Sequence, residues 1–96
     1  MQLGETLEAV CDASSFLEFA RRLAQDRADE VQKEAVRPSS PFGPGANGWE
    51  NGTIEAFLES AVSWGEDTEL GLSQGLSPEN PWKRFAVFLY CGKIYE

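Results

Sequence analysis

Apolar residues recur at helical spacing in the first third of the chain and predict a helix over about residues 15–34. One face of this segment carries Phe16, Phe19, Ala20 and Leu23, which are three or four residues apart as an amphipathic helix requires. Ser15 and Glu18 have the spacing of a capping box, in which the serine oxygen accepts the backbone N–H of Glu18. Arg27 falls on the apolar face, so we expect the stripe to end near Ala24 and the last turns to project into water.

A second amphipathic pattern predicts a helix over about residues 53–65, with Asn51 or Thr53 as its N-cap. Its apolar face contains Ile54, Phe57, Leu58, Ala61, Val62 and Trp64, a sector wide enough to face a core. Trp49 precedes the cap, where a hydrophobic residue can fold back on the first turn. Trp49 and Trp64 could edge a binding surface or fill the core, and the position of Trp64 on the apolar face favours the core.

The third helix is predicted over about residues 81–92. Asn80 is a suitable N-cap, and Pro81 suits the first helical position, where its missing N–H costs nothing. One face contains Trp82, Phe85, Ala86 and Leu89, and we expect Trp64 and Trp82 to be largely buried near Phe16, Phe19 and Leu89. The run AVFLYC is apolar nearly all round, so residues 86–95 read alone would also suit a buried strand. The cap and the length favour a helix.

These patterns predict an all-α fold, a small single-domain bundle of three main helices that spans residues 1–96. Leu3, Leu7 and Val10 allow a short helix within residues 1–13. Residues 37–48, with three prolines and three glycines, are predicted to form a loop, with Phe42 tucked against the body. Residues 65–79 are predicted to be an acidic connector punctuated by glycine.

Several short motifs resemble those of a family of small bacterial proteins that is catalogued only as a domain of unknown function. They are Trp49-Glu50-Asn51, Phe57-Leu58, Trp64, Pro81-Trp82 with Phe85-Ala86, and the terminal Ile94-Tyr95-Glu96. The similarity spans most of residues 10–96 and implies a helical domain, with a helix over residues 81–95. Gly92 departs from the alanine expected there. The resemblance implies no activity and no catalytic residues.

The charge is strongly and unevenly negative. Sixteen acidic side chains against eight basic ones give a net charge of −8, and seven acids lie between residues 50 and 79 without any Lys or Arg: Glu50, Glu55, Glu59, Glu66, Asp67, Glu69 and Glu79. Such a surface would repel a phosphate backbone, so we expect no nucleic-acid binding. It permits a protein partner with a basic surface, and the candidate partner-binding residues are Glu55, Glu59, Glu66, Asp67 and Glu69. The alternative is an acidic face that only maintains solubility.

Several chemistries lack their usual residues. The chain has no histidine, no CxxC pair and no glycine-rich phosphate loop, which argues against the commonest general base, a zinc site and nucleotide binding. The segment 66–69 lacks the ligand spacing of a calcium loop. We therefore predict no catalytic residue, no cofactor and no metal site.

The compartment is expected to be the cytoplasm, because no apolar run is long enough to cross a membrane and the N-terminus lacks the pattern of a signal peptide. In that reducing setting Cys11 and Cys91 are expected to be free thiols, the alternative being a disulfide between them.

Three classes of function are compatible with this sequence. The favoured class is an interaction protein that binds a basic partner, for example an immunity or antitoxin-type inhibitor that covers a basic active site. The second is an accessory domain or homodimer that acts through a hydrophobic groove with Phe88 and Tyr95. The third is a carboxylate-based enzyme, to which the exposure expected for Glu55 and Glu59 is unfavourable. We expect a monomer or homodimer that is not an enzyme.

Overall fold

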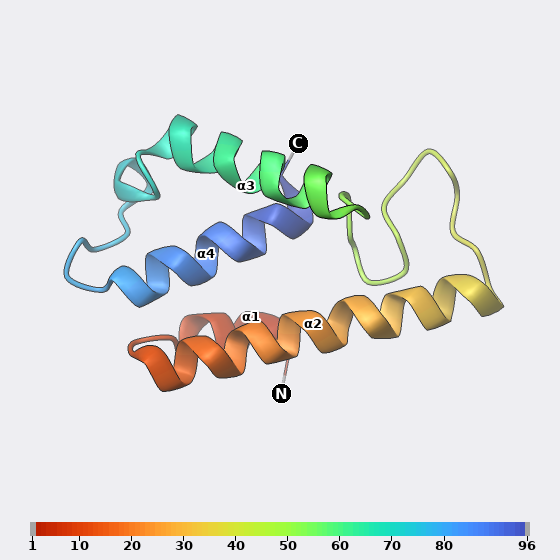
Figure 1. Cartoon of the computed structure of the whole chain (residues 1–96), viewed down its shortest axis with the longest axis horizontal. Helices are drawn as coiled ribbons and strands as arrows, with labels where there is room; N and C mark the ends of the chain where they lie inside the picture. Colours follow the sequence, from red (N-terminus) through yellow and green to blue (C-terminus); the bar gives the residue numbers. More distant parts are fainter. Residues whose placement is uncertain (1, 96) are drawn as a thin grey trace.

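The structure, a computed structural model, describes residues 2–95, and in that range it contains helices and no strand (Figure 1). Its elements are α1 (Leu3–Glu8), α2 (Ala13–Val36), α3 (Ile54–Thr68), the short 3₁₀ helix η1 (Leu72–Gln74) and α4 (Pro81–Ile94). The predicted all-α fold, with three main helices and a short N-terminal one, is confirmed. Residues 86–94 are helical rather than extended. Glu96, the last residue of the quoted terminal motif, lies outside the described residues.

Helix α2 begins earlier than predicted because Asp12, and not Ser15, is its N-cap. An Asp12 carboxylate oxygen accepts the Ser15 N–H at 2.8 Å, and the Ser15 hydroxyl oxygen accepts the Asp12 N–H at 3.1 Å. This is a capping box displaced by three residues. Glu18, predicted to complete the box, accepts instead from Arg21 and Arg22 at 2.6 and 2.9 Å. The predicted Ser15–Glu18 box is wrong because an equally good capping residue lies upstream.

The predicted starts of the other two main helices are confirmed. The Thr53 hydroxyl accepts the N–H of Ala56 at 3.1 Å. The Asn80 side-chain oxygen accepts the N–H of Lys83 at 3.1 Å, with proline in the first helical position. Each cap satisfies one of the backbone donors that a helix N-terminus leaves without a partner.

Asn51 joins the start of α3 to the end of α4. Its side-chain N–H₂ donates to the carbonyls of Gly92 and Tyr95 at 2.9 and 3.0 Å. The two helices approach closely here, because a Cβ built on Gly92 would lie 2.7 Å from the Phe57 ring. Glycine therefore stands in place of the expected alanine to admit Phe57, and α4 continues through it as a helix.

The three longer helices form one layer in which α4 lies between α2 and α3 (Figure 1). Within the described residues α2 and α3 do not pack on each other, whereas α1 packs against both α2 and α4. The main core cluster contains Val10, Phe19, Leu23, Trp49 and Ala86. Leu3 and Leu7 of α1 pack against its edge. This arrangement surrounds α4 on three sides, from α2, α3 and α1.

The tryptophans differ in burial. Trp64 and Trp49 are buried, at 2% and 8% exposure, and Trp49 stacks on Phe57 in the first turn of α3. These two predictions are confirmed. Trp82 is only partly buried, although its predicted contact with Phe16 is present at 5.6 Å between ring centroids. Trp64 lies outside the main core cluster because α3, which carries it, does not pack on α2.

Part of the predicted apolar face of α3 is exposed. The exposed fractions of Ile54, Leu58 and Val62 are 78%, 49% and 46%. Because α3 has a single long helical neighbour, it buries only the sector around Ala61 and Trp64. The other side of the apolar sector faces water.

The last turns of α2 are largely exposed, as predicted, with Val31 and Val36 51% and 88% exposed, but the loop folds back on one side of its C-terminal half. Glu30, a residue of this half, is only 2% exposed. Phe42, which was expected to pack on the body, is 96% exposed. The loop is held by polar contacts of its backbone with α2 rather than by this phenylalanine.

Both cysteines are free thiols, Cys11 exposed and Cys91 buried, which confirms the prediction. Burial raises the pKa of the Cys91 thiol to about 11. Such a thiol stays protonated at neutral pH and is a poor nucleophile.

Candidate functional site

Three of the five predicted partner-binding residues form one exposed stripe along α3. Glu55, Glu59 and Glu66 are all exposed, and their spacings of four and seven residues place them on one side of the helix. The buried sector of α3 lies on the opposite side, with Ala61 and Trp64. Helix periodicity therefore brings these carboxylates together. We call these three residues the acidic stripe.

The other two predicted residues lie elsewhere. Asp67 is turned toward the end of α4, where it accepts a hydrogen bond from the Tyr95 hydroxyl at 2.5 Å and raises the pKa of that tyrosine. Glu69 is the C-cap of α3, in a left-handed backbone conformation with φ of 53°. Arg84 of α4 donates to the neighbouring carbonyl of Leu70 at 2.9 Å. It brings to this end of α3 a positive charge that the sequence count between residues 50 and 79 does not include.

The acidic stripe borders the exposed apolar residues of α3. Leu58 and Val62 lie about 40° and 80° around the helix from Ile54, and Glu55 and Glu59 follow at about 100° and 140°. The water-facing side of α3 thus has an apolar edge and an acidic edge.

A hollow of about 430 Å³ opens between α2 and α3 on the apolar side of this stripe. Its walls are mostly apolar and include Ala20, Leu23, Ala24, Ile54, Phe57 and Leu58. Arg27 and Trp49 line its other end. The hollow exists because α2 and α3 are separated by α4 and do not contact each other.

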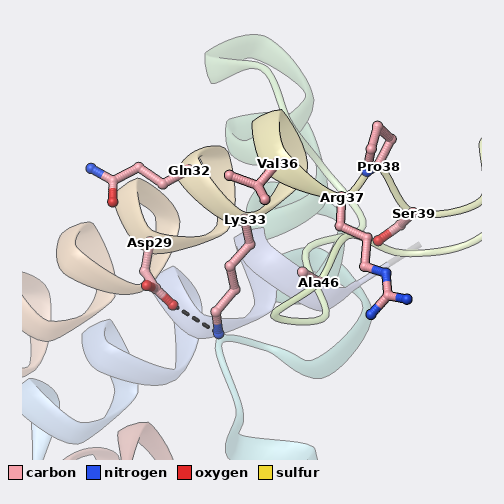
Figure 2. Close-up of a pocket in the computed structure, with 8 residues that line it drawn as sticks. All are labelled: Asp29, Gln32, Lys33, Val36, Arg37, Pro38, Ser39 and Ala46. Atoms are coloured by element: carbon pink, nitrogen blue, oxygen red, sulfur yellow. Dashed lines mark ion pairs between the residues drawn. The ribbon is translucent and has the colours of Figure 1, made fainter.

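A larger hollow, of about 650 Å³, lies between the end of α2 and the loop (Figure 2). Lys33 there forms an ion pair with Asp29 at 3.0 Å and donates to Asn47 at 2.9 Å. Figure 2 shows the Arg37 side chain extending away from Lys33. Because the two cations diverge, this hollow has no converging charges to hold an anion.

A buried polar cluster that was not predicted from the sequence lies beside Trp49. One oxygen of the Glu30 carboxylate accepts the backbone N–H groups of Asn47 and Trp49 at 2.9 and 3.2 Å. The other accepts from Arg27 at 2.7 Å. A Cβ on Gly45 would lie 2.2 Å from this carboxylate, so the loop wraps tightly around it. Glu30 thus fastens the loop to α2.

A second buried pair completes the cluster. Lys93 of α4, 6% exposed, donates to Asp26 at 2.6 Å, and the Trp49 indole N–H donates to the same carboxylate oxygen at 2.9 Å. The cations of Arg27 and Lys93 each lie 5.6 Å from the centre of the Trp49 ring, within cation–π range. In the sequence, the feature that could have indicated this cluster is the set of charged residues at the end of the apolar stripe of α2.

The polar cluster is internally satisfied. Among residues 2–95 no buried side-chain nitrogen or oxygen lacks a hydrogen-bond partner. The same residues contain no group of three or more Cys, Asp or Glu side chains placed to hold a metal ion. They also contain no helix long and apolar enough to cross a membrane. The cluster thus acts as a clamp that holds the loop on α2.

Acid is expected to release the loop from α2. Hydrogen bonds from Asn47 and Lys33 lower the pKa of Asp29, and those from Ser39 and Ala46 lower the pKa of Glu34. A lowered pKa in the folded state means that these contacts stabilise the protein above the ordinary carboxyl values of 3.8 and 4.5. Their contribution is lost as pH falls through the lowered folded values.

The measurement is an NMR pH titration of the amide signals. The Ser39 and Ala46 amides should shift with midpoints below the ordinary glutamate value. The amide of Ala56, which donates to a hydroxyl, is the internal control and should not follow them. Midpoints at or above 4.5 would contradict the assignment of Glu34 as the loop anchor.

Comparison with known families gives a match to part of the chain. The model of the Family of unknown function (DUF7660) matches residues 12–96. No curated protein and no solved structure matches the chain. The matched range covers α2, α3 and α4 and begins at the N-cap of α2.

Proposed function

We propose that this chain, which belongs to the Family of unknown function (DUF7660), is a protein-interaction module that binds a partner with a basic surface through α3. The observation that carries the proposal is the acidic stripe of Glu55, Glu59 and Glu66 beside the exposed Leu58. An inhibitor of the immunity or antitoxin type, covering a basic active site, is one form that such a module takes.

The acidic stripe lacks countercharges among the residues that the structure describes. No ion pair within residues 2–95 involves Glu55, Glu59 or Glu66. Glu18 of α2, by contrast, is paired with both Arg21 and Arg22. A local excess of one charge accelerates the encounter with a partner of opposite charge and penalises like-charged partners.

The two alternative functions receive less support. Phe88 and Tyr95, proposed for a hydrophobic groove, are half-buried; the Phe88 ring faces Gly65 of α3, and Tyr95 is bonded to Asp67. For a carboxylate enzyme, Glu55 and Glu59 would need a pocket, yet neither hollow described above is lined by them. We therefore favour binding over catalysis.

The test is charge reversal with a control that changes the net charge equally. The wild-type protein serves as bait, the captured partner is identified and purified, and binding kinetics are measured at low and high salt. We expect Glu55→Lys with Glu59→Lys to slow association by roughly tenfold at low salt. Glu5→Lys with Glu79→Lys, two exposed sites away from α3, should have little effect.

The salt dependence decides the result. Screening should shrink the difference between wild type and the α3 variant at high salt, because exposed charges separated by more than the Debye length interact weakly. Equal association rates for both double variants at low salt would overturn the proposal.

A further inference from the structure

One face of α4 is partly uncovered between α2 and α3, at Phe85. Leu89, one turn further on, is partly buried against the core, and Gly92 is buried in contact with Phe57 of α3. Phe85 is 44% exposed, although it lies next to Trp82 at 6.2 Å between ring centroids. Lys83 is about 200° around the helix from Phe85 and donates to the Glu8 carbonyl at the end of α1. Helix α1 thus covers the opposite side of α4.

Exposed apolar residues of the neighbouring helices flank this face. On α2 they are Ala20 and Ala24, which line the hollow, and Leu17, which is 57% exposed and lies one turn earlier at helical spacing. On α3 they are Ile54 and Leu58. We call these residues, Phe85 of α4 and the hollow of about 430 Å³ the trough; the hollow itself is lined by α2, by α3 and by residues 49–53. Exposed apolar residues gathered on one face mark binding sites in soluble proteins.

The charges at the edges of the trough indicate the chemistry of its occupant. On the α3 edge Glu55 and Glu59 have no cationic partner within the described residues. On the α2 edge the cations already have carboxylate partners, because Arg21 shares Glu18 with Arg22 and Arg27 pairs with Glu30 at 2.7 Å. An occupant therefore needs an apolar face and one basic edge that meets the carboxylates of α3.

We propose that the trough binds an amphipathic helix of a partner protein, with its apolar face on Phe85, Leu58 and Leu17 and a row of Lys or Arg against the acidic stripe. This is the helix-in-groove mode of recognition, with anchors at helical spacing. The acidic stripe, from residue 55 to residue 66, is about 17 Å long at 1.5 Å per residue. That length matches about three turns of a bound helix. The inference rests on the proposed function and specifies its partner element.

The probe is a capped synthetic helix of about 16 residues, with leucines at spacings of four, three and four and a lysine after each leucine. The remaining positions are alanine and glutamine. Two control peptides carry glutamate in place of lysine, or the same residues in scrambled order. We expect the lysine peptide to bind the full chain, as followed by fluorescence anisotropy, and both controls to bind at least roughly tenfold more weakly.

Two substitutions of partly exposed apolar residues locate the binding site. Leu58 is 49% exposed on the trough wall. Leu58→Arg should therefore weaken the binding of the lysine peptide by roughly tenfold or more. Leu72→Arg, at a residue 41% exposed in η1, is the matched control and should bind as wild type does. Circular dichroism verifies that both variants are folded. In an ¹⁵N-labelled protein the shifted amides should include those of residues 54–58 and 85–89.

Several results would overturn the inference. They are equal binding of the lysine and scrambled peptides, equal binding by wild type and Leu58→Arg, and amide shifts confined to η1 or the loop. A wild-type dimer that Leu58→Arg dissociates, with no peptide binding, would assign the trough to a second copy instead. Partner binding that is sensitive to Glu55→Lys with Glu59→Lys but not to Leu58→Arg would preserve the proposed function while excluding the trough.

Discussion

Replacing Glu30 with alanine is expected to lower the free energy of unfolding by about 3–5 kcal/mol, as removal of one partner from a buried charge pair does. The Glu30 carboxylate is 2% exposed and accepts from Asn47, Trp49 and Arg27. Its removal leaves two backbone N–H groups and a guanidinium without their acceptor. Since a domain of this size is stable by roughly 5–10 kcal/mol, the loss is a large share of the total.

Urea denaturation measures this loss, with Glu34→Ala as the matched control. Glu34 lies one turn further along α2 and also accepts loop N–H groups, those of Ser39 and Ala46, but from a solvent-accessible position. We expect a much smaller change for Glu34→Ala. Equal effects of the two substitutions would show that burial of the Glu30 carboxylate contributes nothing special to the clamp.

Truncation of Trp64 to alanine is expected to cost about 3–5 kcal/mol, the range found when large aromatic residues are removed from cores. Trp64 is 2% exposed, and its indole N–H donates to the Gln74 side chain at 3.0 Å. The substitution would therefore leave a cavity between α3 and the connector and an unused acceptor on Gln74. Thermal and urea unfolding should both report the loss.

Trp82→Ala is the comparison, because Trp82 is only partly buried and its removal should cost clearly less. If Trp64→Ala does not fold, Trp64→Phe retains most of the apolar volume and should give a smaller, measurable destabilisation. A larger loss of unfolding free energy for Trp82→Ala than for Trp64→Ala would contradict the assignment of Trp64 as the more deeply buried residue.

The clamp and the trough are mechanically linked. Since α2 and α3 do not pack on each other, their separation depends on α4 and on the segment that precedes α3. Arg27 donates to the Gly52 carbonyl at 3.1 Å and to Glu30, so α2 holds the residue next to the N-cap of α3. The buried polar cluster thus fixes the position of the start of α3 at one end of the trough.

Local sequence determined most of the secondary structure. Thr53, Asn80 and Pro81 act where predicted because capping depends on residues three positions apart. The same locality explains the acidic stripe, since Glu55, Glu59 and Glu66 share a face in any helix that contains them. The start of α2 differs from the predicted one because Asp12 and Ser15 are both good capping residues. The capping box that forms includes them both.

The sequence by itself determined the helical class, the helix positions and the acidic stripe, all of which follow from interactions within a few residues. Only the tertiary structure decided that Leu58 faces water while Glu30 and Lys93 are buried. Hydrophobicity predicts the reverse, and the reason is geometric. Helix α3 has one long neighbour and cannot bury its whole apolar sector. Glu30 and Lys93, in contrast, meet hydrogen-bonding and charged partners from the loop and α2, and these partners offset the cost of burying a charge.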